Sequence, residues 1–286
     1  MKDSHRESTE SVDSVPIPKA GGVNYGSYLR VNDLLNLQHC LSHPQEHDEL
    51  LFIQIHQIYE LWFKQILHEV SFAMSMLRDE RLLAFERTMK RVHTIQRILT
   101  HQVDVLETMT PVDFNRFRDL LNPASGFQSW QFRELEFRLG AKEPVFLKFH
   151  QHDAQAMRAL EKALEEPTLY DFFLQLLVRR GFAIDSSVVH RDVTKSYSAN
   201  ESVQAAILGI YRDPIRHYDL YTVLESLIDL DEGILLWRQR HVVMVERMIG
   251  SRKGTGGSSG VRYLSNTLNT RFFPEIWEAR NWLGKY

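Results

Sequence analysis

The chain has 286 residues, of which 43% are hydrophobic and 25% are charged, so it is long enough to bury a sizeable core. A formal net charge of -3 gives no global field that would favour nucleic acid or an acidic membrane surface. The single cysteine, Cys40, excludes an intramolecular disulfide framework and any site built from several thiolates, and it favours a reducing, cytoplasmic location.

The first 22 residues are rich in Ser, Asp, Glu and Lys and lack hydrophobic periodicity, so we expect a disordered tail over residues 1–22. This tail has no apolar core of the kind that marks a secretory signal. No apolar run in the chain approaches the roughly 18–20 residues that span a bilayer. A patterned region begins near Tyr25, and we expect a single all-helical domain over residues 23–286 in a protein without a membrane segment.

Residues 42–77 predict one long helix that is apolar on more than one side, which is typical of a buried helix. Ser42 and Gln45 have the spacing of a capping box, and Pro44 fits the first turn. A second long helix is predicted over residues 81–108, and Thr110-Pro111 predicts the start of a shorter helix that ends at Asn122-Pro123.

The remaining pattern is also helical. We expect helices over residues 128–139, 153–165, 168–180, 200–212, 216–250 and 274–282, and a polar loop over residues 185–200. Alternating runs with the period of a strand are essentially missing, and no linker or internal repeat divides the chain. The fold class predicted from the sequence is therefore all-α.

Several motifs that would indicate common enzyme classes are missing, including the G-x-S-x-G elbow, the P-loop, the G-x-G-x-x-G unit and HExxH. Short basic runs favour solvated faces or helix ends over a nucleic-acid patch; they include Arg238, Arg240 and Arg252-Lys253. His43 and His47 have the spacing of a metal-binding pair on a helix, but the polar sequence around them favours two surface histidines.

Two other histidines lie in apolar stretches. Phe52, His56 and Phe63 share one helical face, and His241 lies in a stripe with Trp237, Met244, Val245 and Met248. An imidazole that projects from such a stripe suits a haem ligand. On the pattern alone, a core histidine that has found a hydrogen-bond partner is the simpler interpretation of each.

Polar groups in two loops could complete a pocket. Arg118 follows Phe114 by one turn, and a guanidinium beside phenyl rings can bind a carboxylate in a bidentate manner, although a solvent-facing arginine is the simpler interpretation. Ser125 and Gly126 follow in a loop. Residues 254–260, GTGGSSG, fit either a flexible linker or a loop that folds over a ligand and presents the Thr255 hydroxyl to it.

Taken together, five segments resemble the tryptophan 2,3-dioxygenase family, and the resemblance runs from about Tyr25 to Pro274. The segments are YGSYL (25–29), HDELLFIQIHQIYELWFKQILHE (47–69), FRDLLNPASGFQS (117–129), WRQRHVVMVERMIG (237–250) and GTGGSSG (254–260). Five such segments in the family's order are far more specific than any one of them.

The resemblance implies an entirely helical homotetramer with one haem b per subunit, active as Fe(II). His241 would be the proximal iron ligand, and His56 would be the distal, catalytic histidine. Arg118 would bind the substrate carboxylate and Thr255 its ammonium group. The further substrate-binding residues that the resemblance implies are Phe52, Ile53, Gln54, Ile55, Phe114 and Ser125, together with Tyr25, Tyr28 and Leu29 from a segment that crosses into a neighbouring subunit. Family members carry Tyr or Phe at position 114, so no phenolic hydroxyl acts there in this chain.

The implied reaction adds both atoms of O2 across the indole C2–C3 bond of L-tryptophan and gives N-formyl-L-kynurenine, the first step of tryptophan catabolism by the kynurenine pathway. One alternative is a related haem dioxygenase with a broader tolerance for indoleamines, although Arg118 and Thr255 together favour a free amino acid. A second alternative is a haem-based gas sensor or O2-binding protein without turnover. A helical scaffold without a cofactor is the third.

Overall fold

The computed structural model describes residues 22–257 and 259–284, so the tail predicted for residues 1–22 lies outside the described residues except for Gly22. The chain divides into two compact units, one that ends at His39 and one that begins at Cys40. The single domain expected over residues 23–286 stays a prediction. Throughout the described residues the regular structure consists of helices and 3₁₀ turns, which confirms the all-α class.

The N-terminal unit contains two short helices, α1 (Tyr25–Leu29) and α2 (Val31–Leu35). Asn24 starts α1 by accepting a hydrogen bond from the backbone N–H of Ser27, and the Ser27 hydroxyl accepts in return from the Asn24 N–H. Arg30 separates the two helices because its backbone adopts the left-handed conformation, with φ of 52°. Tyr25 and Tyr28 of α1 are 78% and 77% exposed.

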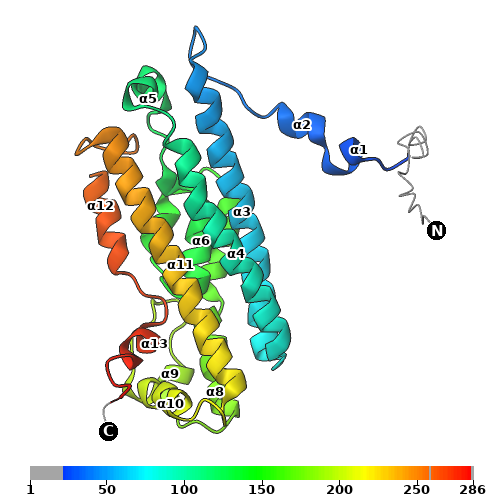
Figure 1. Cartoon of the computed structure of the whole chain (residues 1–286), viewed down its shortest axis with the longest axis vertical. Helices are drawn as coiled ribbons and strands as arrows, with labels where there is room; N and C mark the ends of the chain where they lie inside the picture. Colours follow the sequence, from blue (N-terminus) through cyan, green and yellow to red (C-terminus); the bar gives the residue numbers. More distant parts are fainter. Residues whose placement is uncertain (1–21, 258, 285–286) are drawn as a thin grey trace, which may run out of the picture. The chain divides into compact units, whose positions relative to one another are not determined.

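The second unit is a helical bundle (Figure 1). Its helices are α3 (His47–Arg78), α4 (Leu82–Leu106), α5 (Pro111–Phe117), α6 (Trp130–Leu139), α7 (Ala154–Glu165), α8 (Leu169–Arg179), α9 (Ser186–Val189), α10 (Glu201–Arg212), α11 (Tyr218–Ile249), α12 (Val261–Asn266) and α13 (Pro274–Ala279). The three longest, α3, α4 and α11, lie side by side and build the frame of the unit. Helix α3 begins at the end of the bundle where α11 finishes.

Helix α3 starts later than the sequence pattern predicted, because the expected capping box at Ser42 does not form. The helix begins at His47, and Pro44 lies before it. The carboxylate of Glu49 instead accepts hydrogen bonds from the backbone N–H groups of Leu41 and Ser42 and from the Ser42 hydroxyl. These contacts hold the preceding segment against the first turn of α3 outside the helix, with a bend at His43 and Pro44.

The other predicted helices form with ends that differ by a few residues. Thr110 caps α5 by accepting from the Asp113 N–H, with Pro111 at the first helical position as expected. This helix ends at Phe117 and continues as a 3₁₀ turn over Arg118–Leu121. The last predicted helix, over residues 274–282, is the shorter α13.

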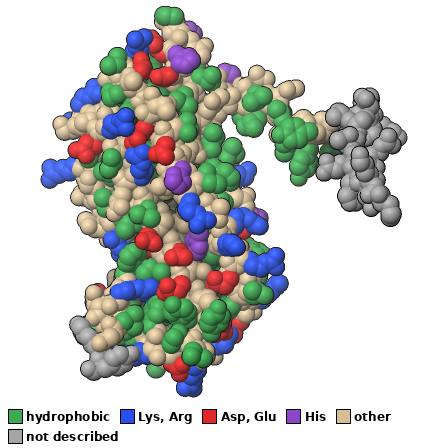
Figure 2. All heavy atoms as spheres, viewed as in Figure 1, with side chains coloured by type: hydrophobic (Ala, Val, Ile, Leu, Met, Phe, Trp, Pro, Cys, Tyr) green, Lys and Arg blue, Asp and Glu red, His purple; other side chains and the backbone are tan. Residues whose placement is uncertain are grey.

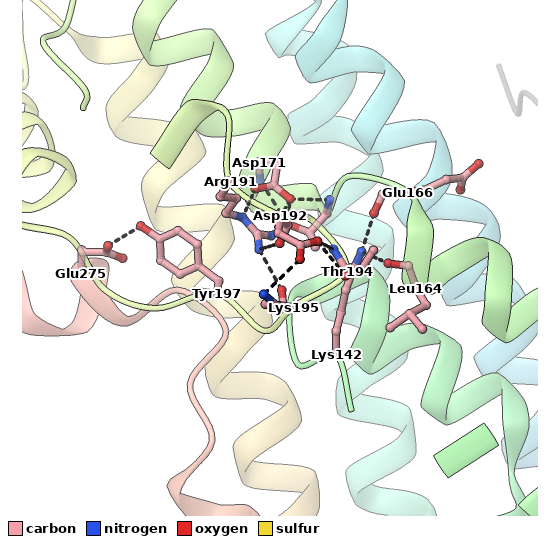
Figure 3. A network of polar contacts seen from close by, with 11 residues as sticks. Lys142, Leu164, Glu166, Asp171, Arg191, Asp192, Thr194, Lys195, Tyr197 and Glu275 are labelled. Carbon is pink, nitrogen blue, oxygen red and sulfur yellow. Dashed lines mark hydrogen bonds and ion pairs between the residues drawn. The ribbon is translucent and has the colours of Figure 1, made fainter. Parts of the chain in front are cut away.

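The segment expected as a polar loop over residues 185–200 contains the short helix α9 and is held in place by charged side chains (Figure 3). Arg191 donates two hydrogen bonds to the carboxylate of Asp171 on α8, at 2.7 and 2.8 Å. Tyr197 donates to the carboxylate of Glu275 on α13. Lys142 extends beneath the same segment and donates to the backbone carbonyls of Leu164 and Glu166 at the end of α7. The loop is therefore an anchored part of the unit.

The apolar core of the second unit is divided. The largest cluster of buried side chains runs through the middle and the α8–α10–α13 end of the bundle, between α3, α4, α8, α10 and α11. A separate, smaller cluster lies at the opposite end and contains Ile55, Val103, Phe117, Met244 and Met248, among others. The second cluster lies beside a cavity that the first does not fill.

The surface carries both signs of charge. Figure 2 shows acidic and basic side chains interspersed over the face in view, in keeping with the small net charge. Within the described residues, the helices are all too short or too polar to cross a membrane.

Candidate active site

A cavity of about 290 Å³ lies within the second unit, at the end where α3 begins and α11 finishes. This volume is close to the lower end of the range for small-molecule sites, about 300–1,000 Å³. The walls are formed by side chains of α3, α5, α6, α11 and α12, of the end of α4 and the residues after it, and of the loops after residues 117 and 250. The apolar and aromatic part of the lining is Phe52, Tyr59, Phe63, Leu106, Met109, Phe114, Phe127, Phe132, Trp237, Val242, Met244, Val245, Met248, Ile249, Tyr263 and Leu264.

His56 projects into this cavity from α3. Its Nδ1 lies 2.7 Å from the backbone carbonyl oxygen of Phe52, one turn earlier. Because a carbonyl oxygen only accepts, Nδ1 carries the proton and the neutral ring keeps a lone pair on Nε2. Burial within the cavity walls lowers the pKa of His56, although a nearby Glu60 carboxylate opposes this shift. The ring is therefore neutral near pH 7, with Nε2 available as a hydrogen-bond acceptor.

His241 lines the same cavity from α11. Burial lowers its pKa to about 4, with a further contribution from the nearby His56. Its ring stacks on Trp237, with centroids 5.6 Å apart and planes inclined by 13°. A neutral imidazole is the form that coordinates a metal ion.

Arg118 and Thr255 come together at one edge of the cavity, where two loops meet. Arg118 Nη2 donates to the carbonyl oxygen of Lys253 at 2.6 Å. The Thr255 hydroxyl donates to the carbonyl oxygen of Ala124. Ser125 lies at the same junction, and a Cβ on Gly256 would approach the Ser125 Cβ to 2.5 Å. The glycine allows the two loops to meet this closely.

A group of aromatic rings lies beside His56, and two of them, Phe52 and Phe114, line the cavity. Phe52 and Phe114 stack with centroids 5.6 Å apart, and Phe117 packs edge-on against both. The Phe52 ring lies 4.2 Å from the His56 ring. This wall offers a flat apolar surface next to an imidazole and a guanidinium.

The cavity brings together seven of the residues expected from the sequence: Phe52, His56, Phe114, Arg118, Ser125, His241 and Thr255. Three neighbours on α3 do not line it. Ile55 is buried in the smaller apolar cluster, Gln54 is exposed and Ile53 is half-buried. Tyr25, Tyr28 and Leu29 belong to the N-terminal unit, and their side chains are exposed.

A charged cluster in the cavity wall was not expected from the sequence. Arg133, Glu136 and Arg238 all line the cavity and are only 7%, 6% and 5% exposed. Arg238 Nη2 donates to Glu136 at 2.6 Å, and Arg133 pairs with the other carboxylate oxygen. The expectation that Arg238 lies on a solvated face is wrong, because its partner on α6 holds it inside. The i, i+3 spacing of Arg133 and Glu136 is a weak signal that could have suggested the pair.

The histidine pair near the start of α3 lies on the surface, as the polar sequence around it indicated. His47 is the first residue of α3, His43 precedes the helix, and both are exposed. Nowhere among the described residues do three or more His, Cys, Asp or Glu side chains gather as a metal site would require. A single imidazole in an apolar cavity is a different kind of ligand, one that suits a metal already held by another group.

The residues present fit a haem on three observations. His241 supplies one neutral nitrogen, as haem iron requires of a proximal histidine. The walls are mainly apolar and aromatic, as a planar macrocycle requires. The charged cluster contains two guanidinium groups and one carboxylate, and Arg133 Nε is buried without a hydrogen-bond partner among the described residues. That excess of buried positive charge suits an acidic substituent of the ligand.

Comparisons with known proteins agree with this geometry. Residues 10–283 match the family model described as tryptophan 2,3-dioxygenase. A relative named tryptophan 2,3-dioxygenase from Caulobacter vibrioides is 46% identical over 91% of this chain and 98% of its own length. Those from Herpetosiphon aurantiacus and a Nocardioides species, with the same name, are 49% and 50% identical over 90% and 91% of this chain and 97% and 94% of their own lengths. The chain therefore belongs to the tryptophan 2,3-dioxygenase family.

Proposed function

We propose that the protein is a haem-dependent dioxygenase that adds both atoms of O2 across the indole C2–C3 bond of L-tryptophan to give N-formyl-L-kynurenine. The observation that carries this proposal is one apolar cavity that holds two neutral imidazoles from different helices and, at its edge, an arginine and a threonine hydroxyl. This combination suits a metal cofactor together with a zwitterionic amino acid. Family membership supports the same reaction.

Haem b, one per subunit and active in the Fe(II) state, is the cofactor in this proposal. His241 would ligate the iron, and Arg133 and Arg238 would pair with the acidic substituents of the macrocycle. When bound, the haem supplies the activation of O2. The aromatic side chains of the cavity lining, Trp237 and Phe132 among them, would keep water from the reacting atoms and so strengthen the polar interactions in the cavity.

Arg118 and Thr255 would bind the two charged groups of the amino acid. Arg118 has five N–H donors, of which one meets the Lys253 carbonyl, so the remaining donors can bind a carboxylate. The Thr255 hydroxyl can accept from an ammonium group while it donates to the Ala124 carbonyl. Phe52, packed against Phe114, would support the flat face of the indole. These contacts would fix the orientation of the ring relative to His56.

His56 would act on the indole nitrogen. Since the Phe52 carbonyl holds the proton on Nδ1, the lone pair of Nε2 is left to accept a hydrogen bond from the indole N–H. The carbonyl also fixes the orientation of the ring, because it belongs to the same helix. His56 would therefore contact the substrate only through a hydrogen bond to Nε2.

We also propose a cytoplasmic homotetramer in which Tyr25, Tyr28 and Leu29 contribute to the active site of a neighbouring subunit. Its support is the exposure of these three apolar side chains, since large apolar groups that gather on a surface commonly mark a protein interface.

One experiment tests the function. The purified protein is supplied with haem, reduced, exposed to air and given L-tryptophan, while its absorption spectrum is recorded. We expect a Soret band and growth of the N-formylkynurenine absorption. A Soret band without product would favour a gas sensor or an O2-binding protein. Failure to take up haem would overturn the proposal.

A further inference from the structure

The contact between α4 and α11 contains a buried amide that no part of the proposed reaction uses. Gln96 lies on α4, is 4% exposed, and donates from Nε2 to the backbone carbonyl oxygen of Leu230 on α11 at 2.8 Å. A side chain that hydrogen-bonds to the backbone of a facing helix fixes both the rotation of that helix about its axis and its position along that axis. The same pair of helices also shares apolar packing and further polar contacts, among them those of Arg240 with Asp104 and Glu107 at the end of α4.

Gly233 on α11 provides the space for this amide. A Cβ at position 233 would lie 2.6 Å from Gln96 Cδ and Oε1 and 2.7 Å from Nε2. Atoms do not approach this closely, so a Cβ at position 233 would force the Gln96 amide to move, and the amide in its present place occupies a notch on α11 that the glycine leaves open. Glycine inside a helix is unfavourable relative to alanine.

The amide carries a second local cost. Gln96 Oε1 is buried and has no hydrogen-bond partner among the described residues. An apolar side chain of similar length would avoid this cost and would still fill the space. Two unfavourable features at one contact indicate that the contact serves something other than stability.

The register of α11 at Gly233 determines where the cavity residues of that helix lie. Gly233, Trp237 and His241 follow one another at intervals of four residues, so they share one ridge of the helix. At about 1.5 Å per residue, His241 lies about 12 Å beyond Gly233 along the axis. Trp237 connects the two, because it lines the small gap beside Gln96 and Gly233 and also stacks on His241.

We propose that Gln96 is a positioning residue for the iron ligand: by seating its amide in the Gly233 notch and on the Leu230 carbonyl, it sets the register in which α11 presents Trp237 and His241 to the cavity. This inference rests on the proposed function, since it takes His241 as the ligand of haem iron. Gln96 itself does not line the main cavity.

His93 offers a matched control on the same pair of helices. Its Nε2 lies 3.0 Å from the backbone carbonyl oxygen of Ser226 on α11, so it also joins a side chain of α4 to the α11 backbone. This bond lies on the far side of Leu230 from the cavity, and Ser226 has no glycine notch beside it. Gln96→Met and His93→Leu therefore each remove one bond of the same kind.

The test uses the haem-loaded protein and measures the iron–histidine vibration of the reduced form, the rate of haem loss and the thermal midpoint. We expect Gln96→Met to change the vibration and to raise the rate of haem loss about tenfold, in line with residues that orient metal ligands. His93→Leu should lower the midpoint and leave the other two readouts unchanged. The proposal is overturned if Gln96→Met leaves the vibration and haem loss as in the wild type, or if His93→Leu changes them equally.

A second pair of variants tests the notch itself. Gly233→Ala should change the iron–histidine vibration when Gln96 is present and add little in a Gln96→Ala background, because the clashing amide is then gone. Equal effects in both backgrounds would overturn the steric argument. A wild-type protein that forms no Soret band would overturn the proposed function, and this inference with it. If every variant binds haem and shows the same iron–histidine vibration as the wild type, this inference alone is overturned.

Discussion

The Nη2 atom of Arg118 and the backbone carbonyl oxygen of Lys253 form a 2.6 Å hydrogen bond between residues 135 positions apart. This bond connects the proposed carboxylate-binding residue to the glycine-rich loop that covers the same edge of the cavity. A substrate carboxylate would therefore meet a guanidinium whose orientation the loop already determines. Such preorganisation lowers the entropic cost of binding.

Replacement of Arg118 by leucine should act on the carboxylate of the substrate. We expect kcat/KM for L-tryptophan to fall about 100-fold, equal to about 2.7 kcal/mol, with haem affinity unchanged. Steady-state kinetics with L-tryptophan and with tryptamine, which lacks the carboxylate, measure the effect. Arg252→Leu is the control, because Arg252 also ties the loop to α5, through Asn115. Equal losses on both substrates in Arg118→Leu would contradict this role.

Gly256→Ala should prevent the two loops from meeting. The added Cβ would lie 2.5 Å from the Ser125 Cβ and 2.9 Å from its Oγ, so the loop must move away from Thr255's partner, the Ala124 carbonyl. We expect KM for L-tryptophan to rise about tenfold and the thermal midpoint to change little. Ser125→Gly in the same chain should restore part of the affinity. Gly209→Ala on α10, whose Cβ meets its nearest atom at 3.9 Å, serves as the control. Normal KM in Gly256→Ala would show that the loop contact is not needed for binding.

The charged cluster in the cavity wall predicts a preference for the acidic form of the cofactor. Arg238→Met removes one of its two cations, so we expect haem to dissociate at least tenfold faster, while haem dimethyl ester, which lacks the acidic groups, binds wild type and variant alike. Arg240→Met is a suitable comparison, because Arg240 pairs with Glu107 and Asp104 and does not line the cavity. A variant that loses both forms of haem equally would point to general damage to the wall.

The burial of Lys142, whose ammonium group donates to the carbonyls of Leu164 and Glu166 (Figure 3), predicts that stability depends on pH. Burial lowers the pKa of Lys142 from its ordinary value of 10.5 to about 8 in the folded protein. Between pH 8 and 10.5 the unfolded chain keeps a proton that the folded protein has lost, so this residue makes folding more favourable as pH rises through that window. The unfolding free energy of the wild type, measured by urea denaturation, should therefore rise relative to that of Lys142→Met from pH 7.5 to pH 10. A constant difference would mean that Lys142 stays charged.

Sequence periodicity predicted most of the fold, because amphipathic stripes depend on local spacing alone. The stripe around His241 and the face shared by Phe52, His56 and Phe63 both line one cavity, although the pattern alone favoured ordinary core histidines and only the family resemblance implied a shared site. The start of α3 was predicted wrongly because Glu49 accepts from backbone N–H groups that precede the helix, a contact that the capping pattern does not include.

Burial of charge was the least predictable feature. Arg238 appeared in a basic run, and nothing in that run signals that Glu136, 102 residues earlier, would hold it inside. The notch between Gln96 and Gly233 is likewise a contact between two helices distant in the sequence. A single sequence reports periodicity along each helix, but the pairing of side chains between helices depends on how those helices cross.

The division of the apolar core has a consequence for the cofactor-free protein. The large cluster lies between α3, α4, α8, α10 and the first half of α11, and its buried side chains reach the cavity only at Phe63 and Phe132, whereas the small cluster borders the cavity more widely. Loss of the ligand would expose much of the small cluster but only the cavity edge of the large one. Amide hydrogen exchange should therefore become faster at the start of α3 and the end of α11, while the same two helices stay protected at their other ends. Each of these helices would then consist of one half whose order depends on the cofactor and one half that folds without it.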